Sequence, residues 1–79
     1  MSLCVVIPAF NEDASIGRVV QGIKQLDLKC EIVVVDDNSS DYTRQEAQKH
    51  GAVVLRLCDR LGPWGATQTG FRFAYSRGF

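Results

Sequence analysis

The sequence predicts an α/β fold in which a three-stranded parallel sheet, with the spatial order 3-2-1, carries helices on both faces. Two observations lead to this fold class. Apolar runs alternate with segments in which apolar residues recur every three or four positions, which gives the order β-α-β-α-β-α. The expected strands are continuous apolar runs, as in strands that a parallel sheet buries on both faces. Right-handed crossovers then set the strand order, and the result is half of a doubly wound fold.

The amino-terminal half supplies two strands with a helix between them. Leu3–Ile7 is an apolar and mostly β-branched run, which is typical of a strand. Across Asp13–Leu26 the apolar residues gather on one face of a helix, and Asn11 or Asp13 is expected to cap its first amides. Glu31–Val35 is the second apolar run and the second expected strand.

The carboxyl-terminal half repeats this alternation. Thr43 and Glu46 have the spacing of a capping box, so we expect a helix over Thr43–His50. Ala52–Leu57 is the third expected strand. A third helix is expected over Pro63–Ser76, because proline is well accommodated in the first turn of a helix.

Length and composition limit the possible functions. The 79 residues are expected to form one domain, 1–79, which is short against the roughly 100–150 residues of a typical domain and is expected to be incomplete. Nine basic and nine acidic residues give no net charge, which disfavours a nucleic-acid partner. No apolar run approaches a membrane span and no signal peptide is visible, so we expect a cytoplasmic location. The three cysteines are expected to be buried, reduced thiols; they are Cys4, Cys30 and Cys58.

The loops that follow the three strands are the expected place for a ligand, because doubly wound folds bind ligands at the carboxyl ends of their strands. The first of these loops, residues 8–13, contains no glycine. Both the dinucleotide fingerprint and the phosphate-binding P-loop require glycines at this point of the chain, where the backbone approaches the phosphates. The sequence therefore excludes these two common phosphate sites.

The first two loops instead combine Pro8, Ala9 and an aromatic side chain with a pair of carboxylates, Asp36 and Asp37. A carboxylate at this position can accept a hydrogen bond from the imide N–H of a base or from a ribose hydroxyl. Adjacent residues on an extended segment point to opposite sides, so the two carboxylates are not expected to act together on one metal. The alternative interpretation is loop chemistry alone, because Asp, Asn and Ser stabilise turns and helix ends.

Three segments together resemble the opening of a family 2 glycosyltransferase, a family with the GT-A fold. They are VVIPAFNE at residues 5–12, EIVVVDDNSSD at 31–41 and RLGPWGATQTGF at 60–71. They are similar to the family's V-I-P-x-[YF]-N-E, V-V-D-D-G-S-x-D and N-x-G-x-x-x-A-x-x-x-G segments, in the same order. Asn38 stands where the family most often has glycine, and Asn tolerates the left-handed conformation that such a turn needs.

The resemblance implies that this chain is the nucleotide-binding part of an enzyme that transfers a sugar from a UDP- or GDP-linked donor to an acceptor. The residues that it implies for nucleotide-sugar binding are Pro8, Ala9, Phe10, Glu12, Asp36, Asp37, Gly62, Gly65 and Ala66. Asp37 is expected to accept from the base or ribose with Asp36 supporting it. The two glycines and Ala66 are expected to bring the third helix close to the diphosphate.

The resemblance also implies Mg²⁺ or Mn²⁺ for the complete family domain, held by a D-x-D motif. The sequence contains no D-x-D, so we expect no metal site and no catalytic residue within these 79 residues. The chain alone is accordingly expected to be inactive in sugar transfer.

Two other functions fit parts of the sequence. The open, apolar Leu3–Ile7 edge strand is expected to pair with a second copy, so we expect a homodimer or another form of self-association. The main alternative function is a non-catalytic self-associating or regulatory module that uses this edge. A receiver-type phosphoacceptor domain is the weaker one, because only Glu12, Asp13 and Asp59 loosely supply its acidic cluster.

Side chains outside these motifs have simpler interpretations. Trp64, Phe71 and Tyr75 recur at helical spacing, which predicts a core-facing stripe, although Trp64 is expected next to the crevice. Asp59 and Arg60 are interpreted as a solvated pair in a loop.

Overall fold

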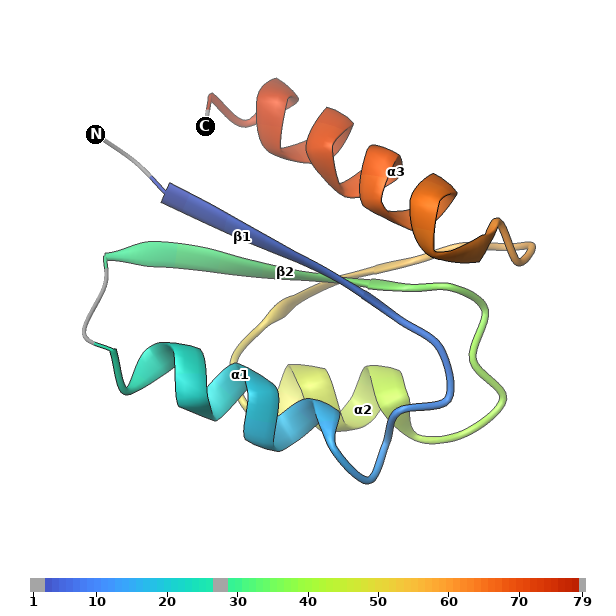
Figure 1. Ribbon diagram of the computed structural model, residues 1–79, viewed down its shortest axis with the longest axis horizontal. Helices are drawn as coiled ribbons and strands as arrows, with labels where there is room; N and C mark the ends of the chain where they lie inside the picture. The colour runs from blue at the N-terminus through green and yellow to red at the C-terminus, as the bar shows by residue number, and fades with distance from the viewer. Residues whose placement is uncertain (1–2, 27–28, 79) are drawn as a thin grey trace.

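A computed structural model describes residues 3–26 and 29–78 of the chain. Within them, three parallel strands form one sheet in the order β1-β2-β3, the arrangement that the sequence predicts. The strands are β1 (Leu3–Ala9), β2 (Cys30–Asp36) and β3 (Val53–Arg56), and the helices are α1 (Ile16–Lys24), α2 (Thr43–Lys49) and α3 (Gly62–Ser76). β1 lies at one edge of the sheet and β2 in its centre. Figure 1 labels these two strands and shows helices on both sides of them.

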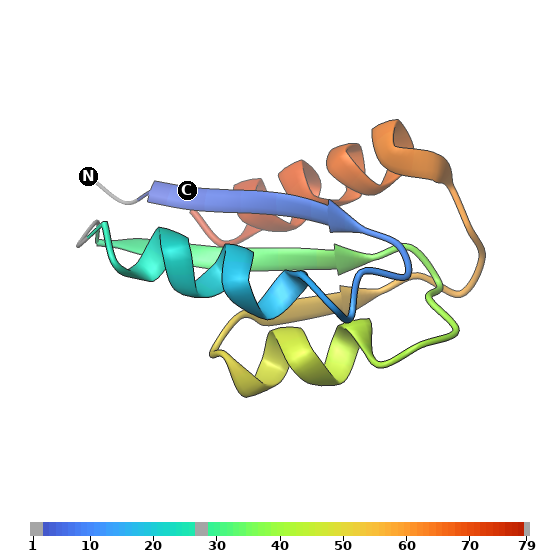
Figure 2. The same cartoon turned by 60° about the horizontal axis from the view of Figure 1, so that its bottom comes forward.

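The sheet has a helical layer on each face. Helices α1 and α2 cover one face, and α3 crosses the other (Figure 2). The central strand serves both layers, because its side chains alternate between the two faces. Ile32 and Val34 belong to the core under α1 and α2, whereas Val33 and Val35 pack with Ala66 of α3. The continuous apolar run that predicted a parallel sheet is therefore explained by burial on both sides.

Each element lies where the sequence predicts it, but its bounds differ from the expected ones by one to three residues. β1 continues through Pro8 to Ala9, because an edge strand tolerates a residue without an N–H. α1 begins at Ile16 and not at Asp13, after a turn in which the Ile16 amide donates to the Glu12 carbonyl at 2.8 Å. β3 is shorter than expected and spans four residues.

The capping predictions for the first two helices are wrong. The residues that precede the first turns are Ser15 in α1 and Tyr42 in α2, and neither helix has a side-chain cap. Asn11, Asp13 and Thr43 use their side chains to connect the two loops at the carboxyl ends of β1 and β2. Long-range bonds between the loops have replaced the local ones.

The aromatic stripe of α3 faces outward, contrary to the prediction. Trp64, Phe71 and Tyr75 are 72%, 57% and 84% exposed. The buried residues of α3, which pack on the sheet, are the small ones Ala66, Gly70 and Ala74, and Phe73 packs half-buried beside them. Small side chains let α3 approach the strands closely, while Trp64, Phe71 and Tyr75 remain outside.

Two further expectations concern the membrane and the cysteines. No helix in the described ranges is long and apolar enough to span a membrane. The three cysteines are free thiols, as predicted, but they are not fully buried: Cys4 and Cys30 are half-buried, and Cys58 is exposed.

Candidate nucleotide site at the carboxyl ends of the strands

Hydrogen bonds join the loop after β1 to the loop after β2. The Asn11 amide donates to Ser39 Oγ at 2.9 Å, and the Glu12 amide donates to Thr43 Oγ1 at 2.8 Å. In return, the Ser40 amide donates to Asn11 Oδ1 at 2.9 Å. Asn11 and Asn38 have positive φ angles, of 51° and 61°, which turn the two loops toward each other. The expected left-handed conformation at residue 38 is confirmed.

Asp41 carries much of this connection between the loops. Its carboxylate accepts hydrogen bonds from the Thr43 amide at 2.9 Å, from the Thr43 hydroxyl and from the Asp13 amide at 3.2 Å. Burial works against the charged form of Asp41, but these hydrogen bonds outweigh it and lower the pKa of its carboxyl group. The ionised carboxylate therefore holds the first turn of α2 against the loop that follows β1.

The other carboxylate of interest, Asp37, holds the loop that leads into α3. Its two oxygens accept hydrogen bonds from the backbone amides of Leu61 at 2.7 Å and Gly62 at 2.8 Å. The Asp37 amide in turn donates to the Ala9 carbonyl at 2.8 Å. Asp37 is only 2% exposed, so it lies buried between the ends of β1 and β2 and the start of α3. Gly62 can present its amide because its φ of 82° is one that glycine adopts freely.

Arg60 approaches the same carboxylate from the cavity side. Its Nε lies 3.6 Å from Asp37 Oδ2, and its guanidinium carbon lies 3.7 Å from the centre of the Phe10 ring. The interpretation of Asp59 and Arg60 as a solvated loop pair is therefore wrong for Arg60. Although 54% of its side chain is exposed, the guanidinium stacks on an aromatic face beside a buried carboxylate.

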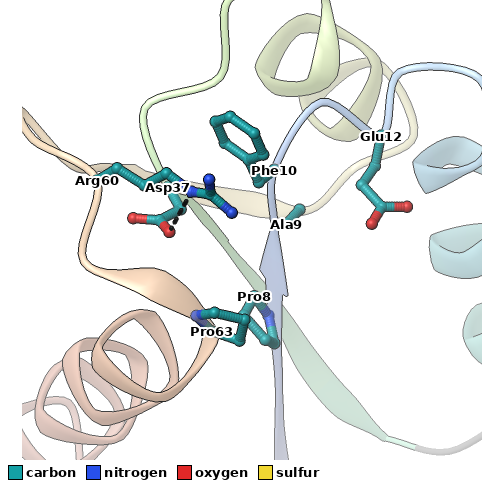
Figure 3. Close-up of a pocket in the computed structure, with 7 residues that line it drawn as sticks. All are labelled: Pro8, Ala9, Phe10, Glu12, Asp37, Arg60 and Pro63. Carbon is teal, nitrogen blue, oxygen red and sulfur yellow. Dashed lines mark ion pairs between the residues drawn. The ribbon is translucent and has the colours of Figure 1, made fainter.

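These groups surround a cavity of about 190 Å³ at the carboxyl ends of the strands. Figure 3 shows Arg60 and Asp37 on one side of the end of β1 and Glu12 on the other, with Phe10 above and the two prolines below. Its lining residues are Pro8, Ala9, Phe10, Glu12, Asp37, Arg60 and Pro63. An aromatic face, an ion pair and an exposed carboxylate thus meet in one hollow of the surface.

Five of the nine residues proposed from the sequence line this cavity: Pro8, Ala9, Phe10, Glu12 and Asp37. Asp36 lies on the opposite side of its strand, where it accepts from the Ser39 amide at 3.0 Å and lines a second, polar cavity. The remaining three, Gly62, Gly65 and Ala66, are absent from the cavity lining. Their roles in binding stay predictions, and the structure shows other tasks for two of them. Gly62 donates to Asp37, and Ala66 is fully buried against the sheet.

Two lining residues, Arg60 and Pro63, were not among the predicted site residues. Arg60 could have been predicted from its position in the loop that follows the third strand, because this loop lies beside the two loops that supply the rest of the site. Of the three acidic residues that a receiver-type site would need, only Glu12 lines the cavity.

The residues around the cavity do not form a metal site. No group of three or more His, Cys, Asp or Glu side chains is arranged to hold an ion within residues 3–26 and 29–78. Asp36 and Asp37 diverge as the sequence predicts, and both oxygens of Asp37 already accept backbone hydrogen bonds. The described residues therefore do not fit Mg²⁺ or Mn²⁺.

The fold and the position of the cavity define the class: a doubly wound α/β domain with a site where its parallel strands end. The sequence profile described as Glycosyl transferase family 2 matches residues 4–77. The chain thus belongs to glycosyl transferase family 2, and its three parallel strands match the amino-terminal portion of GT-A structures.

Individual proteins support this assignment. The chain is 44% identical to an uncharacterized protein of Methanocaldococcus jannaschii, over 89% of this chain and 28% of that protein. A mannosyltransferase from Pyrobaculum calidifontis, solved with GDP-Man and Mn²⁺, matches with a TM-score of 0.82 and 27% identity, over 90% of this chain and 24% of that one.

A third relative was solved with a different nucleotide. Glucosyl-3-phosphoglycerate synthase from Mycobacterium tuberculosis, in complex with Mn²⁺, UDP and phosphoglyceric acid, matches with a TM-score of 0.63 and 38% identity. The match covers 70% of this chain and 20% of that one. In all three comparisons the chain spans less than a third of the relative's length.

Proposed function

We propose that this chain binds the nucleotide part of a UDP- or GDP-linked sugar in the cavity between Phe10 and Asp37. In a longer protein that contains it, this portion would serve the transfer of the sugar to an acceptor. The observation that carries the proposal is the buried Asp37 carboxylate beside an aromatic ring, at the end of a parallel sheet. Two relatives, solved with GDP-Man and with UDP, support this ligand class.

The chemistry of the cavity suits a base and its ribose. The Phe10 ring offers a face on which a planar base can stack, and the carbonyls of Pro8 and Ala9 belong to rigid backbone next to it. Each Asp37 oxygen has a second lone pair in addition to the one that accepts a backbone amide, so it can still accept from a base N–H. Glu12 is exposed at the rim, within the lining, where a carboxylate can accept from ribose hydroxyls.

The size of the cavity agrees with partial rather than complete enclosure of a nucleotide sugar. At about 190 Å³ it is smaller than the roughly 300–1,000 Å³ of typical small-molecule pockets. We therefore assign to it the base and ribose only. Since the described residues do not fit a divalent cation, we expect this part of the binding to be independent of metal.

The test is a titration of the chain with UDP and with GDP, in EDTA and in Mg²⁺, followed by protein NMR. We expect amide shifts that cluster at residues 9–12, 37 and 60–62 and that persist in EDTA. Asp37→Asn should weaken the binding, whereas Asp59→Asn, an exposed neighbour outside the cavity lining, should leave it unchanged. Absence of shifts at millimolar nucleotide, in a chain whose spectrum shows a folded protein, would contradict the proposal.

A second candidate function is self-association through β1. Among the described residues β1 pairs only with β2, so its other edge has unpaired backbone groups, and Leu3 on this strand is 47% exposed. A second copy could add its own β1 to that edge. The chain would then act as a module for self-association, and this function would not require a nucleotide.

Sedimentation velocity over a range of protein concentrations tests this candidate. A dimer that Leu3→Lys converts to a monomer would support it, because lysine on an edge strand opposes pairing. Leu26→Lys, at an exposed position just beyond the end of α1, is the matched control and should leave the dimer intact. A monomer at every concentration would contradict the candidate.

A further inference from the structure

The Phe10 ring already has a partner on the face where a base would stack. The Arg60 guanidinium carbon lies 3.7 Å from the ring centre, which is the separation of two groups in direct contact. Figure 3 shows the guanidinium between Phe10 and the Asp37 carboxylate, inside the lining of the cavity. A planar base cannot enter the space between Phe10 and Arg60 at this distance, so the base and the guanidinium compete for one ring face.

Arg60 is also the cation of this cavity. The lining residues include two carboxylates, Glu12 and Asp37, and the single basic side chain of Arg60. A nucleoside diphosphate would bring negative charge to this acidic surrounding. The amides of Leu61 and Gly62 at the start of α3 could have met a phosphate, but both donate to Asp37. The guanidinium therefore remains as the group that can pair with the phosphates.

The contacts that Arg60 makes with Phe10 and Asp37 are weak enough for contacts with a ligand to replace them. Its side chain is about half exposed, its ion pair with Asp37 is 3.6 Å long, and Asp37 keeps two backbone hydrogen bonds without it. A guanidinium on an exposed aromatic face contributes little, about twofold to fivefold in an equilibrium constant. Arg60 can therefore move away from Phe10 while the buried Asp37 carboxylate keeps its two backbone hydrogen bonds.

We propose that Arg60 gates the base subsite and selects ligands that carry a diphosphate. When a nucleoside diphosphate binds, the guanidinium leaves the Phe10 ring and pairs with the phosphates, and the base takes its place. A nucleoside without phosphates displaces Arg60 but gives it no new partner, so it binds weakly. This inference rests on the proposed nucleotide site and names the residue that makes the site specific.

The test compares dissociation constants for uridine and UDP, and for guanosine and GDP, in EDTA. The variants are Arg60→Gln, Arg60→Lys and, as matched control, Arg72→Gln on the exposed side of α3. In Arg60→Gln we expect the nucleoside to bind about twofold to fivefold more tightly and the diphosphate about tenfold more weakly. In Arg60→Lys the diphosphate should still be preferred, because the charge is retained. Arg72→Gln should behave like the unaltered chain.

The ratio of the two dissociation constants is measured within one variant, so a general loss of stability affects both ligands alike. If Arg60→Gln changes neither constant, or weakens both ligands equally, the gate is disproved and the nucleotide site stands. If the unaltered chain binds neither UDP nor GDP, the proposed function itself fails, and the gate fails with it.

Discussion

Asp37 and Asp41 show how single carboxylates organise the strand ends of this chain. Both are acidic residues of one polar loop, yet they hold different partners. Asp37 fixes the start of α3 through two backbone amides, and Asp41 fixes the start of α2 to the loop that follows β1. The site is therefore built around charged side chains whose hydrogen bonds are made before any ligand arrives.

Removal of the Asp37 charge should cost stability as well as binding. In Asp37→Asn one oxygen is replaced by an amide that cannot accept from Leu61 or Gly62, and the attraction of Arg60 is lost. Hydrogen bonds to a charged group contribute about 1.5–3 kcal/mol each, so we expect a decrease of about 1–3 kcal/mol in the free energy of unfolding. Urea unfolding measures it, with Asp59→Asn as the control. An unchanged midpoint would show that the two amides find other partners.

Asp41 should make the stability depend on pH in acid. Its pKa is lower in the folded chain than in the unfolded one, so between these two values the unfolded chain binds more protons. The stabilisation is complete above the unfolded value of about 3.9 and is lost as the pH falls through the folded value. Urea unfolding between pH 6 and pH 2.5 should thus show a smaller acid loss in Asp41→Asn than in the unaltered chain. Equal losses in the two proteins would disprove this role.

Arg60 illustrates what could not be predicted at the scale of the residue. Sequence position placed it in the correct loop, but its neighbours suggested a solvent-facing ion pair with Asp59. Its contacts with Phe10 and Asp37 join positions far apart in the chain, and no local pattern encodes them. The five lining residues found from the sequence, in contrast, belong to two short motifs at strand ends.

At the scale of the element, α3 depends on small residues for its position. A Cβ on Gly70 would overlap Val6 Cγ1 and would lie 3.0 Å from Val35 Cγ2, so α3 lies as close to β1 and β2 as glycine permits. Spacing alone could not show this, because the apolar stripe and the stripe of small residues both repeat with the helix. The large apolar residues suggested that their own face of α3 would be buried. Because α3 approaches the sheet closely, the face with the small residues is buried instead.

Gly70→Ala should therefore push α3 away from the sheet. Because the atoms that the new methyl group meets belong to packed strand side chains, we expect a loss of about 1–3 kcal/mol in the free energy of unfolding. Gly22→Ala is the matched control: the same change in α1 meets nothing within 4 Å and should stabilise the chain by about 0.5–1 kcal/mol. Thermal or urea unfolding of both variants measures the difference, and the same sign for both would contradict the packing argument.

For the whole molecule, the strand order and the parallel sheet were predicted because they follow from patterns that run along the chain. Apolar runs, helical periodicity and the right-handed crossover rule are enough to order three strands. The two helix caps that failed did so because their side chains bond across the sheet end to another loop. Local rules thus gave the architecture, and tertiary contacts decided the details of the site.

Nucleotide binding should stabilise the whole fold, because the cavity lies where all three strands end and α3 begins. UDP or GDP at about a hundred times its dissociation constant should add about 2.7 kcal/mol to the free energy of unfolding. For a domain of this size that corresponds to a rise in Tm of about 10 °C or more. Thermal unfolding in EDTA measures the rise, with inorganic pyrophosphate, which lacks base and ribose, as the control. Equal rises with pyrophosphate and with nucleotide would show that base and ribose add nothing to the binding, which would contradict their assignment to this cavity.

The bonds from Asp37 to the backbone of residues 61 and 62 also determine which sequence changes this loop can tolerate. The hydrogen bond to the Asp37 carboxylate comes from the backbone amide of residue 61, so it does not depend on the side chain at this position. The one amino acid that cannot donate from this position is proline. Over evolutionary time, residue 61 is thus free to drift among nearly all amino acids while the geometry of the site persists. A saturation library at this position should accept most substitutions and reject proline.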